Sequence, residues 1–154
     1  METGRLTPHF SLAELTRSHV ALRRGIDNTP PPERLPALRY LAEQLEVIRT
    51  LLGGVPLHIT SGYRCPALNR AVGGSRRSRH MLGLAADFVA PDFGTPLEIA
   101  RHLVQQGKAF DQLIHEGHWV HFAAPRRPLR PEGRLLTARF GPGGVRYEAG
   151  LDEG

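Results

Sequence analysis

Apolar residues at spacings of three and four through residues 33–52 restrict the possible folds more than any other feature of the chain. This spacing predicts an amphipathic helix with one apolar face. The residues on that face are Leu38, Leu41, Leu45, Ile48 and Leu52. Two glycines, Gly53 and Gly54, follow directly and end the helix. No other segment of the chain predicts a helix as strongly.

The other predicted helices are shorter and begin at residues typical of helix starts. Ser11 with Glu14, and Thr95 with Glu98, have the spacing of a capping box, in which each side chain bonds the other residue's backbone N–H. A further short helix is expected over residues 66–72, because it begins with proline and is followed by two glycines. Three short helices therefore accompany the long one.

Segments rich in alternating apolar residues predict strands, and they lie after the long helix. The predicted strands are VPLHITSGYR (55–64), LAADFVA (84–90) and a hairpin within FDQLIHEGHWVHFAA (110–124). Helices first and antiparallel strands later indicate an α+β fold rather than alternating β-α-β units. We expect a single small domain in which helices pack on a mainly antiparallel sheet.

The length of 154 residues and an apolar fraction of 40% suit one folded domain. We expect the domain to cover residues 1–124. Residues 125–147 contain six arginines and one glutamate among many glycines and prolines, so residues 125–154 are predicted to be an extended or flexible tail. The chain has no apolar run long enough for a membrane span and no signal-peptide pattern, which predicts a soluble protein made in the cytoplasm.

Charge and cysteine content narrow the possible partners and sites. Cys65 is the only cysteine, which excludes an internal disulfide and a multi-cysteine zinc site. The net charge of +5 suits a polyanionic partner. No recognition-helix or stacking-aromatic pattern accompanies that charge, so we do not expect a nucleic-acid partner.

A histidine and an aspartate lie seven residues apart in SRHMLGLAADF, residues 78–88. A helix would place His80 and Asp87 on one face, since seven residues are close to two turns. Gly83 weakens a helix, however, and the residues that follow it alternate like a strand. The alternative is a loop histidine and a strand aspartate that converge on one point.

His121 completes a candidate metal site with these two residues. Two neutral imidazoles and one carboxylate are the ligand types of an open catalytic zinc site, in which water takes the fourth position. Zinc in such a site lowers the pKa of bound water to about 7 and polarises a bound carbonyl group. His80 would come from a loop end, Asp87 from a strand, and His121 from the last strand of the hairpin.

Three motifs resemble the M15 family of zinc peptidases: SGYR (61–64), SRHMLGLAADF (78–88) and WVHF (119–122). The second contains the family pattern Ser-x-His-x-x-Gly-x-Ala-x-Asp without a gap. The family comprises D-alanyl-D-alanine carboxypeptidases and related peptidoglycan peptidases, including phage endolysins. The resemblance extends over residues 9–123 and implies a fold like that of the hedgehog signalling domain and the D-Ala-D-Ala peptidases.

The resemblance implies a role for each residue that matches a family motif. His80, Asp87 and His121 match the zinc ligands, so one Zn²⁺ per chain is expected. Arg64 matches the arginine that binds substrate, a role that suits a guanidinium because it pairs with carboxylates or carbonyl oxygens. Ser78 matches the serine two positions before the first ligand, where its hydroxyl would support the site, contact the substrate or cap a turn.

The general base is expected a few residues before the last ligand, at an offset that varies between branches of the family. Glu116 lies five residues before His121, and His118 lies three before it. Some branches have a glutamate at the second of these positions, and this chain differs from them. We expect Glu116 to act as the base, because a carboxylate near the metal can pass a proton to the leaving amine. His118 is the alternative.

The resemblance implies hydrolysis of peptide bonds in peptidoglycan stem peptides, adjacent to D-alanine, in the cell wall or periplasm. Without a signal peptide, the protein would reach that place through lysis or with a phage. A binding module of the same fold, which keeps the zinc but does not cleave, is the alternative. The sequence distinguishes neither carboxypeptidase from endopeptidase action nor one oligomeric state from another.

Other polar and aromatic residues near the motifs have structural interpretations. Trp119 is expected in the core or the wall of a pocket, and Asp111 and Gln112 are expected to shape the start of a strand without a catalytic role. A solvated loop is the expected setting for three arginines, which would attract an anionic wall polymer if they lay beside the substrate cleft: Arg76, Arg77 and Arg79.

Overall fold

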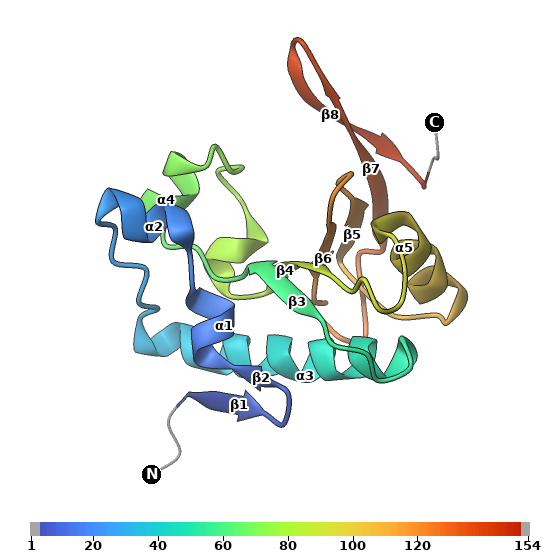
Figure 1. Ribbon diagram of the computed structural model, residues 1–154, viewed down its shortest axis with the longest axis horizontal. Coiled ribbons are helices and arrows are strands. Elements are labelled where there is room, and N and C mark those ends of the chain that lie inside the picture. The colour runs from blue at the N-terminus through green and yellow to red at the C-terminus, as the bar shows by residue number, and fades with distance from the viewer. Residues whose placement is uncertain (1–3, 152–154) are drawn as a thin grey trace.

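A computed structural model describes residues 4–151 and has an α+β fold, as predicted (Figure 1). The helices are α1 (Leu12–Thr16), α2 (His19–Arg24), α3 (Leu35–Leu51), α4 (Pro66–Ala71) and α5 (Pro96–Gln105), with 3-10 turns η1 (Pro32–Arg34) and η2 (Arg79–Leu82). The strands are β1 (Arg5–Thr7), β2 (Phe10–Ser11), β3 (His58–Ser61), β4 (Ala85–Val89), β5 (Gln112–His115), β6 (Val120–Ala123), β7 (Arg134–Gly141) and β8 (Gly144–Ala149).

Six strands form the main sheet in the order β3-β4-β6-β5-β7-β8. Every neighbouring pair is antiparallel except β5 and β7, which are parallel. The sheet is therefore mixed but mainly antiparallel, and the helices are not inserted as alternating crossovers. This confirms the fold class that the order of predicted elements indicates.

The core lies between one face of this sheet and the helices α3 and α5. Figure 1 shows α3 running below the strands, with α5 beside β5 and β6. The fully buried side chains of the core include Leu38, Leu41, Leu45 and Ile48 from α3, Ile99 and Leu103 from α5, and Phe88, Leu113 and Phe122 from the sheet. Burying them contributes about 1.5–3 kcal/mol each. This packing leaves the opposite face of the sheet available for polar residues.

The strongest local signals in the sequence are confirmed. The long helix extends over Leu35–Leu51 and is preceded by the η1 turn. Both capping boxes are present, with Ser11 and Glu14 at α1 and Thr95 and Glu98 at α5. The predicted hairpin forms from β5 and β6.

The C-terminal segment differs from a flexible tail. Residues 134–149 are extended, but they form β7 and β8, which join the edge of the main sheet. The parallel pairing of β5 with β7 brings together residues that lie far apart in the chain, and local composition does not reveal such pairing. The residues after 124 therefore include two strands of the same sheet.

Among residues 4–151, no helix is both long enough and apolar enough to cross a membrane.

Candidate active site

The register of the sheet brings two of the predicted metal ligands side by side. Asp87 on β4 is directly opposite His121 on β6. Ser61 on β3 pairs with Asp87 from the other side. Side chains that are opposite one another on antiparallel strands share a face of the sheet. Their face is the one turned away from the apolar core, so polar groups gather there.

His80 reaches the same point from the η2 turn. Ser78 caps this turn: its hydroxyl accepts a hydrogen bond of 3.1 Å from the backbone N–H of His80. Gly83 ends the turn in the left-handed region, with φ of 73°, where glycine is favoured over any other residue. The glycine of the family pattern thus has a backbone role here. The chain then enters β4, as the loop-and-strand alternative predicts.

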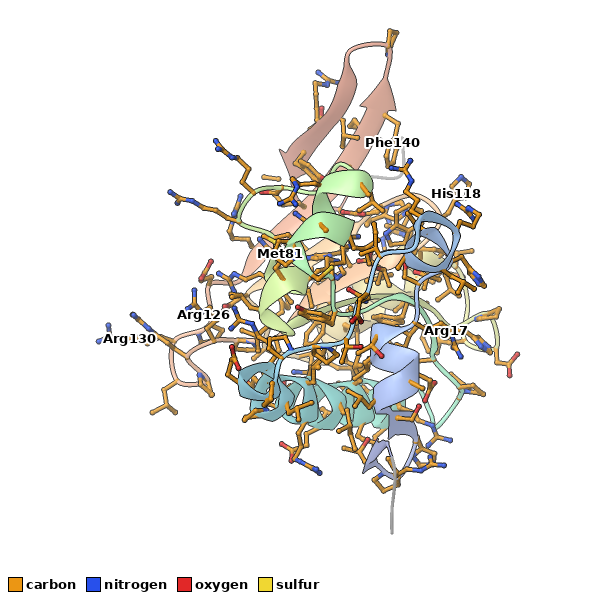
Figure 2. The ribbon with its side chains drawn as sticks, turned by 90° about the vertical axis from the view of Figure 1, so that its left-hand side faces the viewer. Arg17, Met81, His118, Arg126, Arg130 and Phe140 are labelled. Atoms are coloured by element: carbon orange, nitrogen blue, oxygen red, sulfur yellow. The ribbon has the colours of Figure 1, made fainter. Side chains whose placement is uncertain are left out.

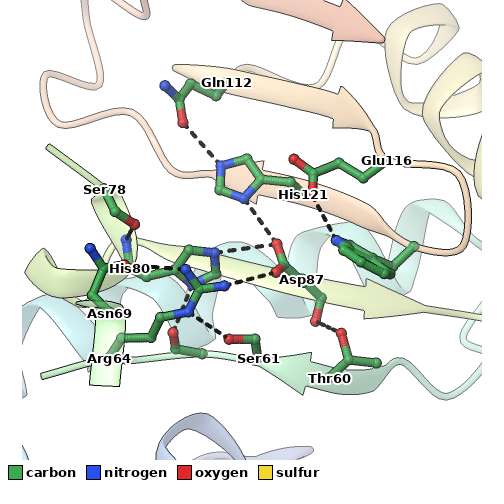
Figure 3. Close-up of polar contacts among 12 residues, drawn as sticks. Thr60, Ser61, Arg64, Asn69, Ser78, His80, Asp87, Gln112, Glu116 and His121 are labelled. Carbon is green, nitrogen blue, oxygen red and sulfur yellow. Dashed lines mark hydrogen bonds and ion pairs between the residues drawn. The ribbon is translucent and has the colours of Figure 1, made fainter. Parts of the chain in front are cut away.

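His80, Asp87 and His121 form a compact, buried cluster (Figure 3). The Asp87 Oδ1 lies 3.3 Å from His80 Nε2 and 2.9 Å from His121 Nδ1. One ligand atom from each of the three residues lies within 4.8 Å of the other two. Ligands at about 2.0–2.1 Å from a tetrahedral zinc ion lie roughly 3.3 Å apart. The cluster therefore has the residue types and the size of a metal site.

Neighbouring groups determine which nitrogen of each histidine faces the centre of the cluster. The Nδ1–H of His80 donates to the carbonyl oxygen of Gly62 at 2.7 Å, which leaves Nε2 facing Asp87. The Nε2–H of His121 donates to Gln112 Oε1 at 3.0 Å, which leaves Nδ1 facing Asp87. Two ring nitrogens and a carboxylate oxygen directed at one point are donor atoms of the kind that bind zinc. The donor set thus fits a divalent metal ion.

Close packing against α1 requires a glycine at position 62, the residue whose carbonyl oxygen binds His80. A Cβ at this position would collide with the backbone carbonyl of Leu15 in α1. The adjacent Tyr63 N–H donates to that same carbonyl at 2.7 Å. The glycine of the SGYR motif is therefore required by the close approach of α1, and this contact also positions the carbonyl that orients His80.

Arg64 lies beside the cluster and is held by three groups (Figure 3). Its Nε donates to Ser61 Oγ at 3.2 Å, and its Nη1 donates to Asn69 Oδ1 at 3.3 Å. Its Nη2 lies 3.6 Å from Asp87 Oδ2. Asn69 is itself buried and donates to the carbonyl of Ser75 at 2.8 Å. The guanidinium is thus oriented before any substrate binds.

The cluster opens on a cavity of about 440 Å³, a size typical of small-ligand sites. Its lining includes all three cluster residues together with Arg64, Ser78, Gln112, Glu116 and Trp119. The serine therefore both caps the η2 turn and borders the cavity, and the tryptophan forms part of the wall.

The structure separates the two candidates for the general base. Glu116 borders the cavity, and its Oε1 accepts a hydrogen bond of 2.9 Å from Trp119 Nε1. His118 is exposed at the surface (Figure 2) and does not border the cavity within the described part of the chain. Burial, reinforced by the negative charge of Asp87, raises the pKa of Glu116 above its usual value. Only the carboxyl group is placed next to the cluster.

Sequence reasoning assigned no site role to Gln112, which borders the cavity and holds His121. Ile114 on β5 is directly opposite His121 on β6. Gln112 lies two residues before Ile114, so it is the diagonal neighbour of His121 on the same face of the sheet. The contact between Gln112 and His121 follows from the strand register, and the residue type alone does not predict it. Asn69 was missed for a similar reason: its amide is held by the carbonyl of Ser75, after α4, and this contact leaves its oxygen facing Arg64.

Arg79 is not a solvated loop residue, and it is the exception among the three arginines of its loop. Its Nη1 donates to Asp111 Oδ2 and its Nη2 donates to Glu132 Oε2, both at 2.6 Å. The Arg79 side chain is only 13% exposed, whereas Arg76 and Arg77 are exposed as expected. Asp111 does lie at the entry to β5, but it also fixes the loop that precedes β7.

Comparison with known proteins adds one finding to this geometry. The chain matches the family described as Peptidase M15 over residues 8–123. The chain belongs to the peptidase M15 family. This match covers every residue of the cluster, both base candidates and Arg64. No curated protein matches the chain.

Membership of a peptidase family and a buried cluster able to hold a metal ion together indicate a metallopeptidase. The M15 family also implies a hedgehog-like fold, which agrees with the helices and mixed sheet of this chain. The family match ends at residue 123, so the β7 and β8 strands lie outside it.

Proposed function

We propose that this M15 peptidase is a zinc enzyme that hydrolyses a peptide bond of peptidoglycan stem peptides, adjacent to D-alanine. The observation that carries the proposal is the buried cluster of His80, Asp87 and His121, whose ring nitrogens are oriented toward one point beside a carboxyl group. Zinc is proposed because two imidazoles and one carboxylate suit it. The stem-peptide substrate rests on the family resemblance, as does action in the cell wall or periplasm.

Arg64 is proposed to bind the substrate. Its side chain is 17% exposed and borders the cavity, so a substrate carboxylate or carbonyl oxygen can reach the guanidinium. Ser61 and Asn69 hold the guanidinium in place, which reduces the conformational entropy lost when substrate binds. Ser78 would contact the substrate from the same cavity.

Glu116 is proposed to move the proton. Its carboxylate would accept a proton from the attacking water and donate it to the amine that leaves. The Trp119 N–H holds one carboxylate oxygen, which leaves the other free for this transfer. Zinc, when bound by the cluster, would lower the pKa of water and polarise the scissile carbonyl group. Arg64 would help to stabilise the negative charge that develops on that carbonyl oxygen.

The first experiment combines metal analysis with a digest. The purified chain is loaded with zinc, its metal content is measured, and it is incubated with purified muropeptides that are then examined by mass spectrometry. We expect one zinc per chain and a cleavage product that a chelator abolishes. The His80→Ala variant should lose both the metal and the product.

Other outcomes of this experiment would contradict the proposal in distinguishable ways. One zinc per chain without any product would favour the non-cleaving binding module. Full zinc occupancy in His80→Ala would contradict the ligand assignment. Cleavage that continues after complete removal of metal would contradict the zinc mechanism itself.

A further inference from the structure

Asp87 of the cluster and the neighbouring Arg64 border two adjacent cavities. The first has a volume of about 440 Å³ and the second about 570 Å³. Four residues border both of them: Arg64, Val72, Asp87 and Trp119. A substrate held by Arg64 therefore has space on two sides. Each cavity is larger than a single terminal alanine would fill.

The β7–β8 hairpin forms one wall of the first cavity. Phe140 pairs with Val145 across the two strands, and both side chains border the cavity together with Tyr147. These three residues are exposed by 61%, 46% and 54%, an unusual amount for large apolar side chains so close together. Figure 1 shows the hairpin projecting beyond the rest of the sheet. The opposite wall comes from the segment between α4 and η2.

Tyr147 borders the same cavity as the carboxyl groups of Glu116 and Asp87. The carboxylates of Glu116 and Asp87 add to the effect of burial in raising the pKa of the Tyr147 hydroxyl. Arg146 and Glu148, the neighbours of Tyr147 in β8, alternate to the other face and form an ion pair at 3.6 Å. One face of the hairpin is thus apolar and turned to the cavity, and the other is charged.

The second cavity extends away from the hairpin. Its lining comes from the start of α2, from β3 and from the segment before α4. Arg17 borders this cavity, whereas Arg77 and Arg134 border the first one. Within residues 4–151, these three exposed arginines form no ion pair with an acidic side chain. Each cavity therefore has at least one exposed arginine that can attract a carboxylate.

The placement of Arg64 bears on which bond is cut. An enzyme that removes one terminal residue needs the groove to end near the group that binds the terminal carboxylate. Here Arg64 borders both cavities, so space for a substrate lies on two sides of the guanidinium. Each cavity is also larger than one residue fills, so a substrate can extend on both sides of the scissile bond.

We propose that an acidic peptide runs through both cavities, so that the enzyme is an endopeptidase, and that the apolar face of the β7–β8 hairpin binds the peptide on one side of the scissile bond. This inference rests on the proposed function. It adds a substrate class, a peptide extended in both directions, and a binding wall made by residues outside the family match.

The first test compares two substrates of the zinc-loaded chain. One is a stem pentapeptide with a free C-terminal D-alanine, and the other is a cross-linked muropeptide dimer. We expect cleavage of the dimer into fragments that are each longer than one residue, with kcat/KM about tenfold above that for the pentapeptide. Release of a single terminal D-alanine as the only reaction would overturn the endopeptidase assignment.

The second test examines the hairpin with matched variants. Tyr147→Ala should raise KM for the dimer about tenfold with little change in kcat, and Tyr147→Phe should restore it because the ring supplies the contact. Arg146→Ala, a truncation on the other face of the same strand, should leave KM unchanged. Equal kinetics for Tyr147→Ala and Arg146→Ala, with equal zinc content, would overturn the hairpin's role.

A binding measurement separates this inference from the proposed function. Zinc-loaded Glu116→Gln, titrated calorimetrically with the two peptides, should bind the dimer about tenfold more tightly than the pentapeptide. Adding Tyr147→Ala should remove that preference. If the wild-type chain hydrolyses neither peptide, the proposed function fails, but the binding preference still tests whether a peptide occupies both cavities. Equal affinities for the two peptides would overturn the inference that both cavities are occupied.

Discussion

Asp87 and Glu116 are carboxyl groups beside the same cavity, but their surroundings act on them in opposite directions. Burial alone would raise the pKa of Asp87, yet the neighbouring His80 and His121 rings outweigh it and lower that pKa. The pKa of Glu116 is raised instead, because burial and the charge of Asp87 outweigh the effects of His121, the Trp119 N–H and Arg64. Two carboxyl groups with pKa values pushed apart are typical of divided roles, one holding charge and one transferring protons.

A substitution at Glu116 tests this division of roles. Glu116→Gln keeps the size of the side chain but removes its ability to accept a proton. We expect kcat to fall about a hundredfold or more, with zinc content unchanged at one per chain. The control is His118→Ala, which should keep wild-type kcat because His118 is exposed. A loss of turnover in His118→Ala and not in Glu116→Gln would assign the base to the histidine.

Gln112 gives a second prediction at the scale of one residue. Its Oε1 accepts the Nε2–H of His121 and so keeps Nδ1 directed at the cluster. Gln112→Ala should weaken zinc affinity about 10- to 100-fold, as measured by competition with a chelator. Gln112→Glu keeps an acceptor and should retain tight binding. Unchanged affinity in Gln112→Ala would show that other contacts orient the ring.

At the scale of elements, Asp111 connects segments that lie far apart in the chain. It is 1% exposed and accepts hydrogen bonds from the backbone N–H groups of Arg126 and Glu132 at 3.0 and 2.9 Å. It also pairs with Arg79, the residue before His80. The metal-site turn η2 and the loop before β7 thus share one anchor.

Substituting Asp111 should therefore change stability in a pH-dependent way. Burial opposes ionisation, but the two N–H groups and Arg79 outweigh it and lower the pKa of Asp111. A lowered pKa stabilises the fold at neutral pH, and this stabilisation is lost as pH falls below about 3.9, the usual value for aspartate. Asp111→Asn should cost about 2 kcal/mol in urea unfolding at pH 7.

The difference between wild type and Asp111→Asn should narrow as pH falls toward 3, since Asp111 of the unfolded chain is then protonated whereas the folded chain resists protonation. Asp92→Asn is a suitable control, because Asp92 is exposed and its substitution should change stability little at either pH. A difference that stays constant from pH 7 to pH 3 would mean that the charge of Asp111 does not contribute.

At the scale of the whole molecule, a metal ion bound by the cluster would join three parts of the fold. His80 comes from η2, Asp87 from β4 and His121 from β6, and all three side chains are buried. Such an ion would neutralise the Asp87 carboxylate and hold the two imidazole rings in place. Metal binding is therefore coupled to global stability.

Chelation measures this coupling. Removing zinc from the wild-type chain should lower Tm by about 10 °C, because ligand at 1,000 times Kd contributes about 4 kcal/mol to a domain of this size. Adding zinc should restore Tm in thermal unfolding followed by circular dichroism. His80→Ala should show no response to chelator. An unchanged wild-type Tm would indicate that zinc binds weakly or not at all.

Local sequence signals predicted the parts of the fold that depend on nearby residues. The long helix, both capping boxes and the β5–β6 hairpin follow from spacings within about one element, and each is confirmed. The candidate ligands His80, Asp87 and His121 were found through motifs, and the structure brings them together. Motifs succeed here because a metal site limits the residue types that can occupy it.

What the sequence by itself determined about this protein is its α+β class, its helices and the chemistry of three buried side chains. The tertiary structure alone decided that residues 134–149 join the sheet, that Gln112 contacts His121, and that Arg64 borders two cavities. The physical reason is distance along the chain. Helix caps and hairpins form between near neighbours, whereas a parallel strand pair and the walls of a groove join segments that no local pattern relates.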